Sequence, residues 1–162
     1  LMGHSFGGYE TLFILTQTNR FATAIAGAAV SDLSSKYLYI DWTLSRPNYW
    51  RFEKHQARMG KSLFEDRAGY DRNSPIANIE KINTPLLTWS GLEDLNVNTT
   101  QSYLVYAALR RLNKQNTLLL YEGERHAILN EENQVDLTNK VESWLKYYLQ
   151  RKDKMDWMYP QN

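Results

Sequence analysis

Cysteine is absent from the 162 residues, which excludes disulfides, thiolate metal sites and cysteine nucleophiles. A chain without cysteine tolerates oxidising and reducing compartments alike. An excess of one charge is also absent, because 19 basic residues face 18 acidic ones and leave a formal net charge of +1. Nucleic acid and anionic membrane surfaces are therefore not expected as partners. No stretch approaches the roughly 18 consecutive apolar residues that a membrane span needs.

The residues that are present fit one globular domain. Hydrophobic residues make up 43% of the chain and charged residues 23%, a balance typical of folded rather than disordered chains. A domain of this length buries roughly 70% of the surface that its unfolded chain exposes. The chain begins with Leu1 instead of methionine, so we expect it to be a fragment whose missing beginning could carry a signal peptide.

Glycine is scarce, with eight residues, but three of them surround Ser5 in the string MGHSFGGYE. The string fits Gly-x-Ser-x-Gly, the pattern of a nucleophile elbow, in which a serine sits on a sharp turn between a strand and a helix. Gly3 and Gly7 are expected to remove Cβ atoms that would crowd this turn, and Gly8 to let the helix pack closely against the strand. The alternative is a glycine-rich turn that carries a surface serine.

Hydrophobic patterning after the elbow predicts strands that alternate with helices. Strands are expected before the elbow and at 21–30, 85–91 and 116–123, and helices at 9–18, 98–112 and 135–149. The stretch 31–69 is irregular, rich in aromatic and charged residues, and is expected to hold one or two helices. Such alternation predicts an α/β fold with a parallel sheet between helices.

An acid and a histidine follow two of the predicted strands. Asp94 comes after the strand that ends at Gly91, and His126 comes after the strand that ends near Gly123. Functional residues of parallel sheets gather at the carboxyl ends of the strands. The chain order Ser5, acid, histidine is that of α/β-hydrolases. An imidazole takes the proton of the serine hydroxyl, and a carboxylate fixes the imidazole's tautomer.

Other residues compete for these roles. His4 lies inside the elbow, where its ring should point away from the serine, and His55 lies in a charged stretch and is expected to be solvated. Glu93 is the alternative to Asp94 as the acid. The histidines show no ligand spacing, so we expect neither a metal nor another cofactor.

These motifs together resemble the peptidase domain of the prolyl oligopeptidase and dipeptidyl peptidase IV family of serine peptidases. The resemblance runs nearly end to end. It is carried by four strings, namely GHSFGGY at 3–9, SPI at 74–76 leading to TPLL at 84–87, Gly-x-x-Asp-x-x-Val at 91–97, and Glu-x-His at 124–126.

The resemblance implies a role for each residue of the motifs. Ser5 would be the nucleophile and His126 the base. Asp94 would be the acid, favoured over Glu93 by its distance from Gly91. The backbone N–H of Phe6 would be one oxyanion donor.

Substrate contacts follow from the same resemblance. Asn96 would contact a carbonyl group of the peptide substrate, Val30 and Leu33 would line the pocket for the residue before the scissile bond, and Val97 would lie beside them. The implied function is a serine peptidase that cleaves peptides after proline or small residues. The alternatives are a carboxylesterase with the same three residues and an inactive relative that serves as an interaction domain, which would have lost part of the triad.

Family members carry an N-terminal β-propeller and upstream hydrolase strands, including a tyrosine that supplies a second oxyanion donor. Residues 1–162 include none of these, so we expect a partial α/β-hydrolase fold. Residues 1–150 would form the C-terminal portion of the peptidase domain and residues 151–162 a tail. The isolated chain is expected to be inactive and to form a homodimer through the open edge of the strand at 21–30. The resemblance is compatible with a periplasmic or secreted protein.

Overall fold

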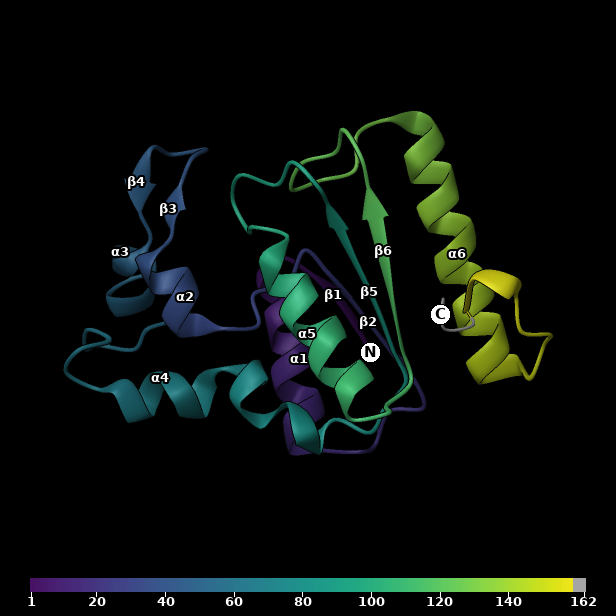
Figure 1. The fold of residues 1–162 in the computed structure, drawn as a ribbon, viewed down its shortest axis with the longest axis horizontal. Coiled ribbons are helices and arrows are strands. Elements are labelled where there is room, and N and C mark those ends of the chain that lie inside the picture. The colour runs from purple at the N-terminus through teal and green to yellow at the C-terminus, as the bar shows by residue number, and fades with distance from the viewer. Residues whose placement is uncertain (159–162) are drawn as a thin grey trace.

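A four-stranded parallel sheet forms the centre of the protein (Figure 1). The computed structural model describes residues 1–158. The sheet has the strand order β1-β2-β5-β6, with bounds Met2–His4 for β1, Ala24–Gly27 for β2, Leu86–Gly91 for β5 and Asn116–Tyr121 for β6. Because all four strands are parallel, their carboxyl ends lie along one edge. This is the α/β architecture that the alternating pattern predicts.

Helices cover both faces of the sheet (Figure 1). On one face lie α1 (Phe6–Gln17), the 3-10 helix η1 (Pro75–Lys81) and α5 (Thr100–Arg111), and on the other lies α6 (Glu131–Gln150). Successive strand residues point to opposite faces, so Leu86 packs in the core under α1 and α5 while Leu87 packs under α6. Both leucines are fully buried. The two layers therefore share one buried sheet.

The stretch predicted as irregular forms a separate small layer beside the sheet (Figure 1). It contains a short antiparallel hairpin and three helices, followed by η1, with bounds Leu33–Leu38 for α2, Ile40–Asp41 for β3, Arg46–Pro47 for β4, Tyr49–Glu53 for α3 and Arg67–Asn73 for α4. Tyr37, Phe52 and Tyr70 pack together in its core. The expectation of one or two helices in 31–69 is confirmed, because α2 and α3 lie within that range and α4 only begins at its end.

Two predicted boundaries were wrong for local reasons. The strand at 21–30 spans only Ala24–Gly27, because Ala28 takes a left-handed backbone conformation with φ 43° that ends the extended run. The last helix begins at Glu131 rather than at 135. The side chain of Asn130 accepts hydrogen bonds from the backbone N–H groups of Glu132 and Asn133 and so caps the helix there.

The open edge of the sheet lies at a different strand from the one expected. The strand predicted at 21–30 is not an edge, because β2 pairs with β1 on one side and with β5 on the other. The outer strands are β1 and β6, and on β1 the side chain of Met2 is 67% exposed. An unpaired strand edge offers backbone groups to another chain, and within the described residues β1 and β6 each have one such edge.

The segment after α6 folds back onto that helix. The ring of Trp157 lies 6.3 Å from that of Trp144, and Met158 is fully buried. Trp144 is also fully buried, and its indole N–H donates to the hydroxyl of Thr23 at 2.6 Å. Of the predicted tail, residues 159–162 lie outside the described residues. No helix within residues 1–158 is long and apolar enough to cross a membrane.

We predict that residues 1–162 in isolation associate, with a two-fold dimer through β1 as the expected form. The exposed edge of β1 and the exposed side chain of Met2 supply unpaired backbone groups and apolar surface, and two-fold dimers are the commonest closed arrangement. Light scattering across micromolar concentrations measures the mass. A monodisperse monomer throughout that range would contradict the prediction.

Candidate active site

The backbone of Ser5 makes a sharp turn between β1 and α1. Ser5 has φ 59° and ψ −118°, a conformation that costs an ordinary residue about 1–3 kcal/mol. Its backbone N–H donates to the carbonyl of Gly27 at 2.8 Å, which fixes the turn to the end of β2. Strain of this kind in a non-glycine residue is typical of a nucleophile elbow.

Two glycines make room for this turn. A Cβ atom on Gly3 would lie 2.1 Å from the carbonyl oxygen of Gly7, and one on Gly8 would lie 2.8 Å from the carbonyl oxygen of Gly27. Gly8 therefore lets α1 approach β2, as the sequence predicts. The same expectation was wrong for Gly7, because a Cβ there meets no atom within 4 Å. Position 7 faces open space on the first turn of α1.

Ser5 occupies the N-cap position of α1, but its side chain makes no capping hydrogen bond. Serine at this position commonly accepts from the backbone of the first turn, so the hydroxyl here is committed elsewhere. The first N–H groups of a helix have no intrahelical acceptor, and Phe6 supplies the first of them. The positive end of the helix dipole adds to their attraction for an anion.

The hydroxyl of Ser5 contacts His126, and His126 contacts Asp94. The distance from His126 Nε2 to Ser5 Oγ is 2.7 Å, and that from His126 Nδ1 to Asp94 Oδ2 is also 2.7 Å. A carboxylate only accepts hydrogen bonds, so Nδ1 carries the proton that it donates to Asp94. Nε2 is then free to accept from the serine hydroxyl. The structure thus brings together the three residues that the sequence singles out, each following a different strand.

Asp94 is fixed by bonds to both carboxylate oxygens. The residue is 3% exposed, and its Oδ1 accepts from the backbone N–H groups of Asn96 at 2.8 Å and Val97 at 2.9 Å. This leaves Oδ2 directed to His126. Glu93, the alternative acid, is exposed, and its backbone N–H donates to the carbonyl of Glu124 at 2.9 Å. Of the two carboxylates, Asp94 is the one in contact with the histidine.

The loop that carries His126 is held by two side chains whose supporting roles sequence reasoning did not identify. Glu124 is buried and accepts from the backbone N–H groups of Leu129 and Asn130. The Leu129 bond is the largest cause that lowers the pKa of Glu124. His4 donates from Nε2 to the carbonyl of His126 at 2.7 Å and stacks on Trp89. The signal for Glu124 was its place in the Glu-x-His string.

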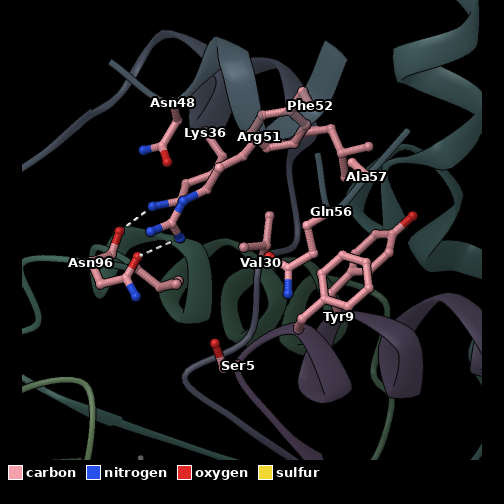
Figure 2. Close-up of a pocket in the computed structure, with 13 residues that line it drawn as sticks. Ser5, Tyr9, Val30, Lys36, Asn48, Arg51, Phe52, Gln56, Ala57 and Asn96 are labelled. Carbon is pink, nitrogen blue, oxygen red and sulfur yellow. Dashed lines mark hydrogen bonds between the residues drawn. The ribbon is translucent and has the colours of Figure 1, made fainter. Parts of the chain in front are cut away.

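A pocket opens beside Ser5 (Figure 2). The space between its lining side chains, open solvent included, is about 490 Å³. Ser5 and Phe6 line the pocket. So do all four residues predicted to contact substrate, namely Val30, Leu33, Asn96 and Val97. Seven other residues complete the lining, namely Tyr9, Lys36, Asn48, Arg51, Phe52, Gln56 and Ala57.

One end of the pocket is polar and was not predicted. Lys36 donates from Nζ to the backbone carbonyl of Asn96, and the guanidinium of Arg51 donates to the Asn96 side-chain oxygen at 3.4 Å (Figure 2). Arg51 also forms an ion pair with the fully buried Asp41 at 3.0 Å. Burial lowers the pKa of Lys36 to about 8, against the opposing attraction of Asp41. No sequence motif marks these side chains, because they lie in the irregular stretch.

Within residues 1–158 no three His, Cys, Asp or Glu side chains gather as a metal site would require. The arrangement is instead a strained serine at a strand-to-helix turn, a histidine and a buried acid, at the carboxyl ends of β1, β6 and β5. A parallel sheet with these features defines the α/β-hydrolase class. The pattern of the prolyl oligopeptidase family matches residues 1–152, and the chain belongs to this family of serine peptidases.

Individual relatives agree with the family. The chain is 30% identical over 154 residues to dipeptidyl peptidase family member 6 of Caenorhabditis elegans, covering 92% of this chain and 20% of the relative. It is 29% identical over 149 residues to dipeptidyl aminopeptidase BIII of Pseudoxanthomonas mexicana, covering 90% and 21%. The chain therefore spans about a fifth of the length of these relatives.

A solved structure shares the fold. An acylaminoacyl peptidase in complex with Z-Gly-Gly-Phe-chloromethyl ketone superimposes with a TM-score of 0.83 at 22% identity, covering 97% of this chain and 25% of that one. This likeness shows that the described part of the chain has the α/β-hydrolase architecture. The sheet and helices of the described residues correspond to about a quarter of that solved chain.

We predict that Gly3→Ala destabilises the protein and that Gly7→Ala does not. An added methyl at Gly3 overlaps the Gly7 carbonyl and should cost about 2 kcal/mol or more. A methyl at Gly7 meets no neighbour and should be neutral or stabilising by up to about 1 kcal/mol, because alanine favours a helix over glycine. Thermal unfolding of both variants measures the difference. Equal destabilisation would contradict the elbow geometry.

Proposed function

We propose that this chain carries the catalytic triad of a serine peptidase that works by acyl transfer. The proposal rests on one observation, the continuous hydrogen-bonded chain from Ser5 through His126 to Asp94. Membership of the prolyl oligopeptidase family supports peptide bonds as the target. Because the chain spans about a fifth of its relatives' length, the activity is proposed for the whole protein.

In the acylation step Ser5 Oγ attacks the carbonyl carbon of the scissile peptide bond. His126 Nε2 takes the hydroxyl proton, and Asp94 stabilises the resulting imidazolium. The negative charge that develops on the carbonyl oxygen is stabilised by the backbone N–H of Phe6, at the positive end of α1. The C–N bond then breaks as His126 returns the proton to the leaving amine, and the acyl group remains as an ester on Ser5.

Deacylation repeats these transfers with water. His126 takes a proton from water as the water oxygen attacks the ester carbonyl. The ester C–O bond then breaks, the proton returns to Ser5 Oγ, and the carboxylic acid product leaves. Asp94 keeps the imidazole in one tautomer through both halves, because its two oxygens are fixed by His126 on one side and by the loop backbone on the other.

We assign the pocket beside Ser5 to the residue before the scissile bond. The side chains of Val30 and Leu33 give it apolar walls, and the family resemblance implies a proline or small residue there. The Asn96 oxygen accepts from Arg51, which leaves its amide N–H groups to donate to a carbonyl group of the peptide substrate.

Substitution of the triad tests this function in the whole protein. Ser5→Ala should abolish peptide hydrolysis, and Asp94→Asn should slow it by about 10⁴-fold while the protein stays folded, because the amide would favour the wrong imidazole tautomer. Glu93→Gln is the matched control and should change little, since Glu93 is exposed. Hydrolysis rates with circular dichroism as a folding check give the answer. Near-full activity of Asp94→Asn together with loss in Glu93→Gln would mean that the wrong carboxylate is assigned.

The same assay separates a peptidase from a carboxylesterase. Chromogenic peptides with proline, small or acidic residues before the bond are compared with simple aryl esters, and a fluorophosphonate probe should label Ser5 in either case. A peptidase hydrolyses the peptides with Ser5-dependent turnover. Turnover of esters but not of peptides would mean that the protein is an esterase and not a peptidase.

We further propose that residues 1–162 alone do not turn over substrate. The family resemblance puts the second oxyanion donor in upstream sequence, and loss of one such donor typically costs about 10²–10³ in rate. Peptide hydrolysis by the isolated chain is the measurement, with its Ser5→Ala variant as background. Ser5-dependent cleavage by the isolated chain would contradict this proposal and leave the triad assignment intact.

A further inference from the structure

The pocket beside Ser5 contains a buried cation that the proposed chemistry does not use. Lys36 is 3% exposed and lines the pocket, where it extends from α2 toward Asn96 (Figure 2). Its ammonium has three N–H donors, and the described residues accept one of them, through the carbonyl of Asn96. The other N–H groups of Lys36 can therefore donate to an occupant of the pocket.

Carboxylates surround Lys36 but are committed to other groups. Asp41 forms an ion pair with Arg51 at 3.0 Å, and Asp94 contacts His126 at 2.7 Å. Among residues 1–158 no carboxylate forms an ion pair with Lys36. Asp41 and Asp94 attract Lys36 from a distance, but their oxygens bind Arg51 and His126, and the Lys36 ammonium keeps two N–H groups without an acceptor among the described residues. Buried N–H donors of a cation that lack acceptors are unfavourable, so an anionic occupant that accepts from Lys36 would stabilise this end of the pocket.

The occupant belongs to the acyl side of the substrate. His126 delivers its proton to the leaving amine, so the leaving group must lie near the imidazole. The pocket is bordered by Ser5 and Phe6, and His126 is not among its lining residues. The side chain that enters it is therefore that of the residue before the scissile bond.

We propose that this pocket selects an acidic side chain, glutamate or aspartate, before the scissile bond, with Lys36 as the residue that determines the specificity. The proposal rests on the serine peptidase function proposed above. The apolar walls of Val30, Leu33 and Phe52 hold the methylene groups of such a side chain, and the ammonium of Lys36 binds its carboxylate. This acidic specificity would take the place of the preference for proline or small residues that the family resemblance implies.

Glutamine is the competing side chain. Asn48 is fully buried in the pocket lining, and its Oδ1 receives no hydrogen bond from the described residues. That oxygen would accept from an amide N–H. The charge of Lys36 decides in favour of the carboxylate, because a hydrogen bond between charged groups is stronger than one between a charged and a neutral group. Matched glutamate and glutamine substrates therefore test the proposal directly.

The first experiment uses the whole protein and peptidyl-aminomethylcoumarin substrates that differ only before the scissile bond. Glu, Asp, Gln, Pro, Ala and Leu are compared, each with a free and an acetylated amino terminus. We expect kcat/KM for Glu or Asp to exceed that for Gln by roughly ten- to hundredfold. Ser5-dependent turnover in which Gln, Pro, Ala or Leu is preferred would overturn the acidic specificity and leave the peptidase function standing.

Substitution of Lys36 tests whether this side chain causes the preference for an acidic residue before the scissile bond. Lys36→Met keeps the length and removes the charge, so it should lower kcat/KM for the Glu substrate by roughly tenfold or more and change that for Leu by less than about threefold. Lys54→Met, at an exposed lysine on the end of α3, is the control and should change neither. Arg51 is left in place because its removal would strand the buried Asp41 carboxylate. Equal losses with Glu and Leu would make Lys36 a structural residue and overturn the proposal.

The pH dependence of the wild-type protein gives a test that needs no variant. Lys36 faces Asp41, Arg51, Asp94 and the ring of Tyr39, and burial lowers its pKa to about 8. Below that pH the ammonium is charged and attracts the carboxylate, and above it the charge is lost. The ratio of kcat/KM for Glu over Gln should therefore fall as pH rises through about 8. A ratio that stays constant from pH 6.5 to 9.5 would overturn the proposal.

Binding separates failure of this proposal from failure of the proposed function. Calorimetry on Ser5→Ala with acetyl-Ala-Glu and acetyl-Ala-Gln requires no turnover. If the wild-type protein hydrolyses none of the substrates, the peptidase function fails. Binding of acetyl-Ala-Glu at least tenfold tighter than acetyl-Ala-Gln would then still support the acidic pocket, and equal binding would overturn it.

Discussion

Ser5 is held at φ 59° between β1 and α1, and the other contacts of the site are arranged around that backbone. The strain is sustained by close approach, because Gly3 lies against the carbonyl of Gly7, and Gly8 against that of Gly27. The turn also removes the Ser5 hydroxyl from its usual capping role. As a result one residue presents a free hydroxyl to His126 while its neighbour Phe6 presents a free backbone N–H.

The polar end of the pocket and the triad share one loop. Asp94 accepts from the backbone N–H of Asn96, and the carbonyl of Asn96 accepts from Lys36. Asn96 is thus bound through its N–H by the acid of the triad and through its carbonyl by Lys36. A change in what fills the pocket can reach Asp94 through this short path, because the backbone of a single residue, Asn96, links Lys36 to Asp94.

The sequence predicted the parts of the fold that depend on local pattern. The run after Pro85 is short, apolar and ended by Gly91, and β5 follows it. The order Ser5, Asp94, His126 pointed to residues that meet, because parallel strands bring their carboxyl ends to one edge. The end of β2 was missed because Ala28 is an alanine in a left-handed conformation, which no local pattern favours.

The pocket could not be predicted in the same way. Lys36, Asp41 and Arg51 come from a stretch without periodicity, and their positions depend on contacts with distant chain. One such contact is the backbone bond from Trp42 to the carbonyl of Leu95 at 3.2 Å. A lysine in an aromatic-rich stretch is expected to be exposed on composition alone, so its burial is visible only after the small layer has packed beside the sheet.

The separation of 121 residues between Ser5 and His126 has a consequence for biosynthesis. A ribosome delivers the serine first and the histidine only after β5, α5 and β6 have been made. The elbow can form on the nascent chain, but its hydroxyl has no proton acceptor until the loop after β6 has left the exit tunnel and docked. Activation of the serine is therefore tied to the order of synthesis, and in a chain that ends before residue 126 the Ser5 hydroxyl is not activated by this histidine.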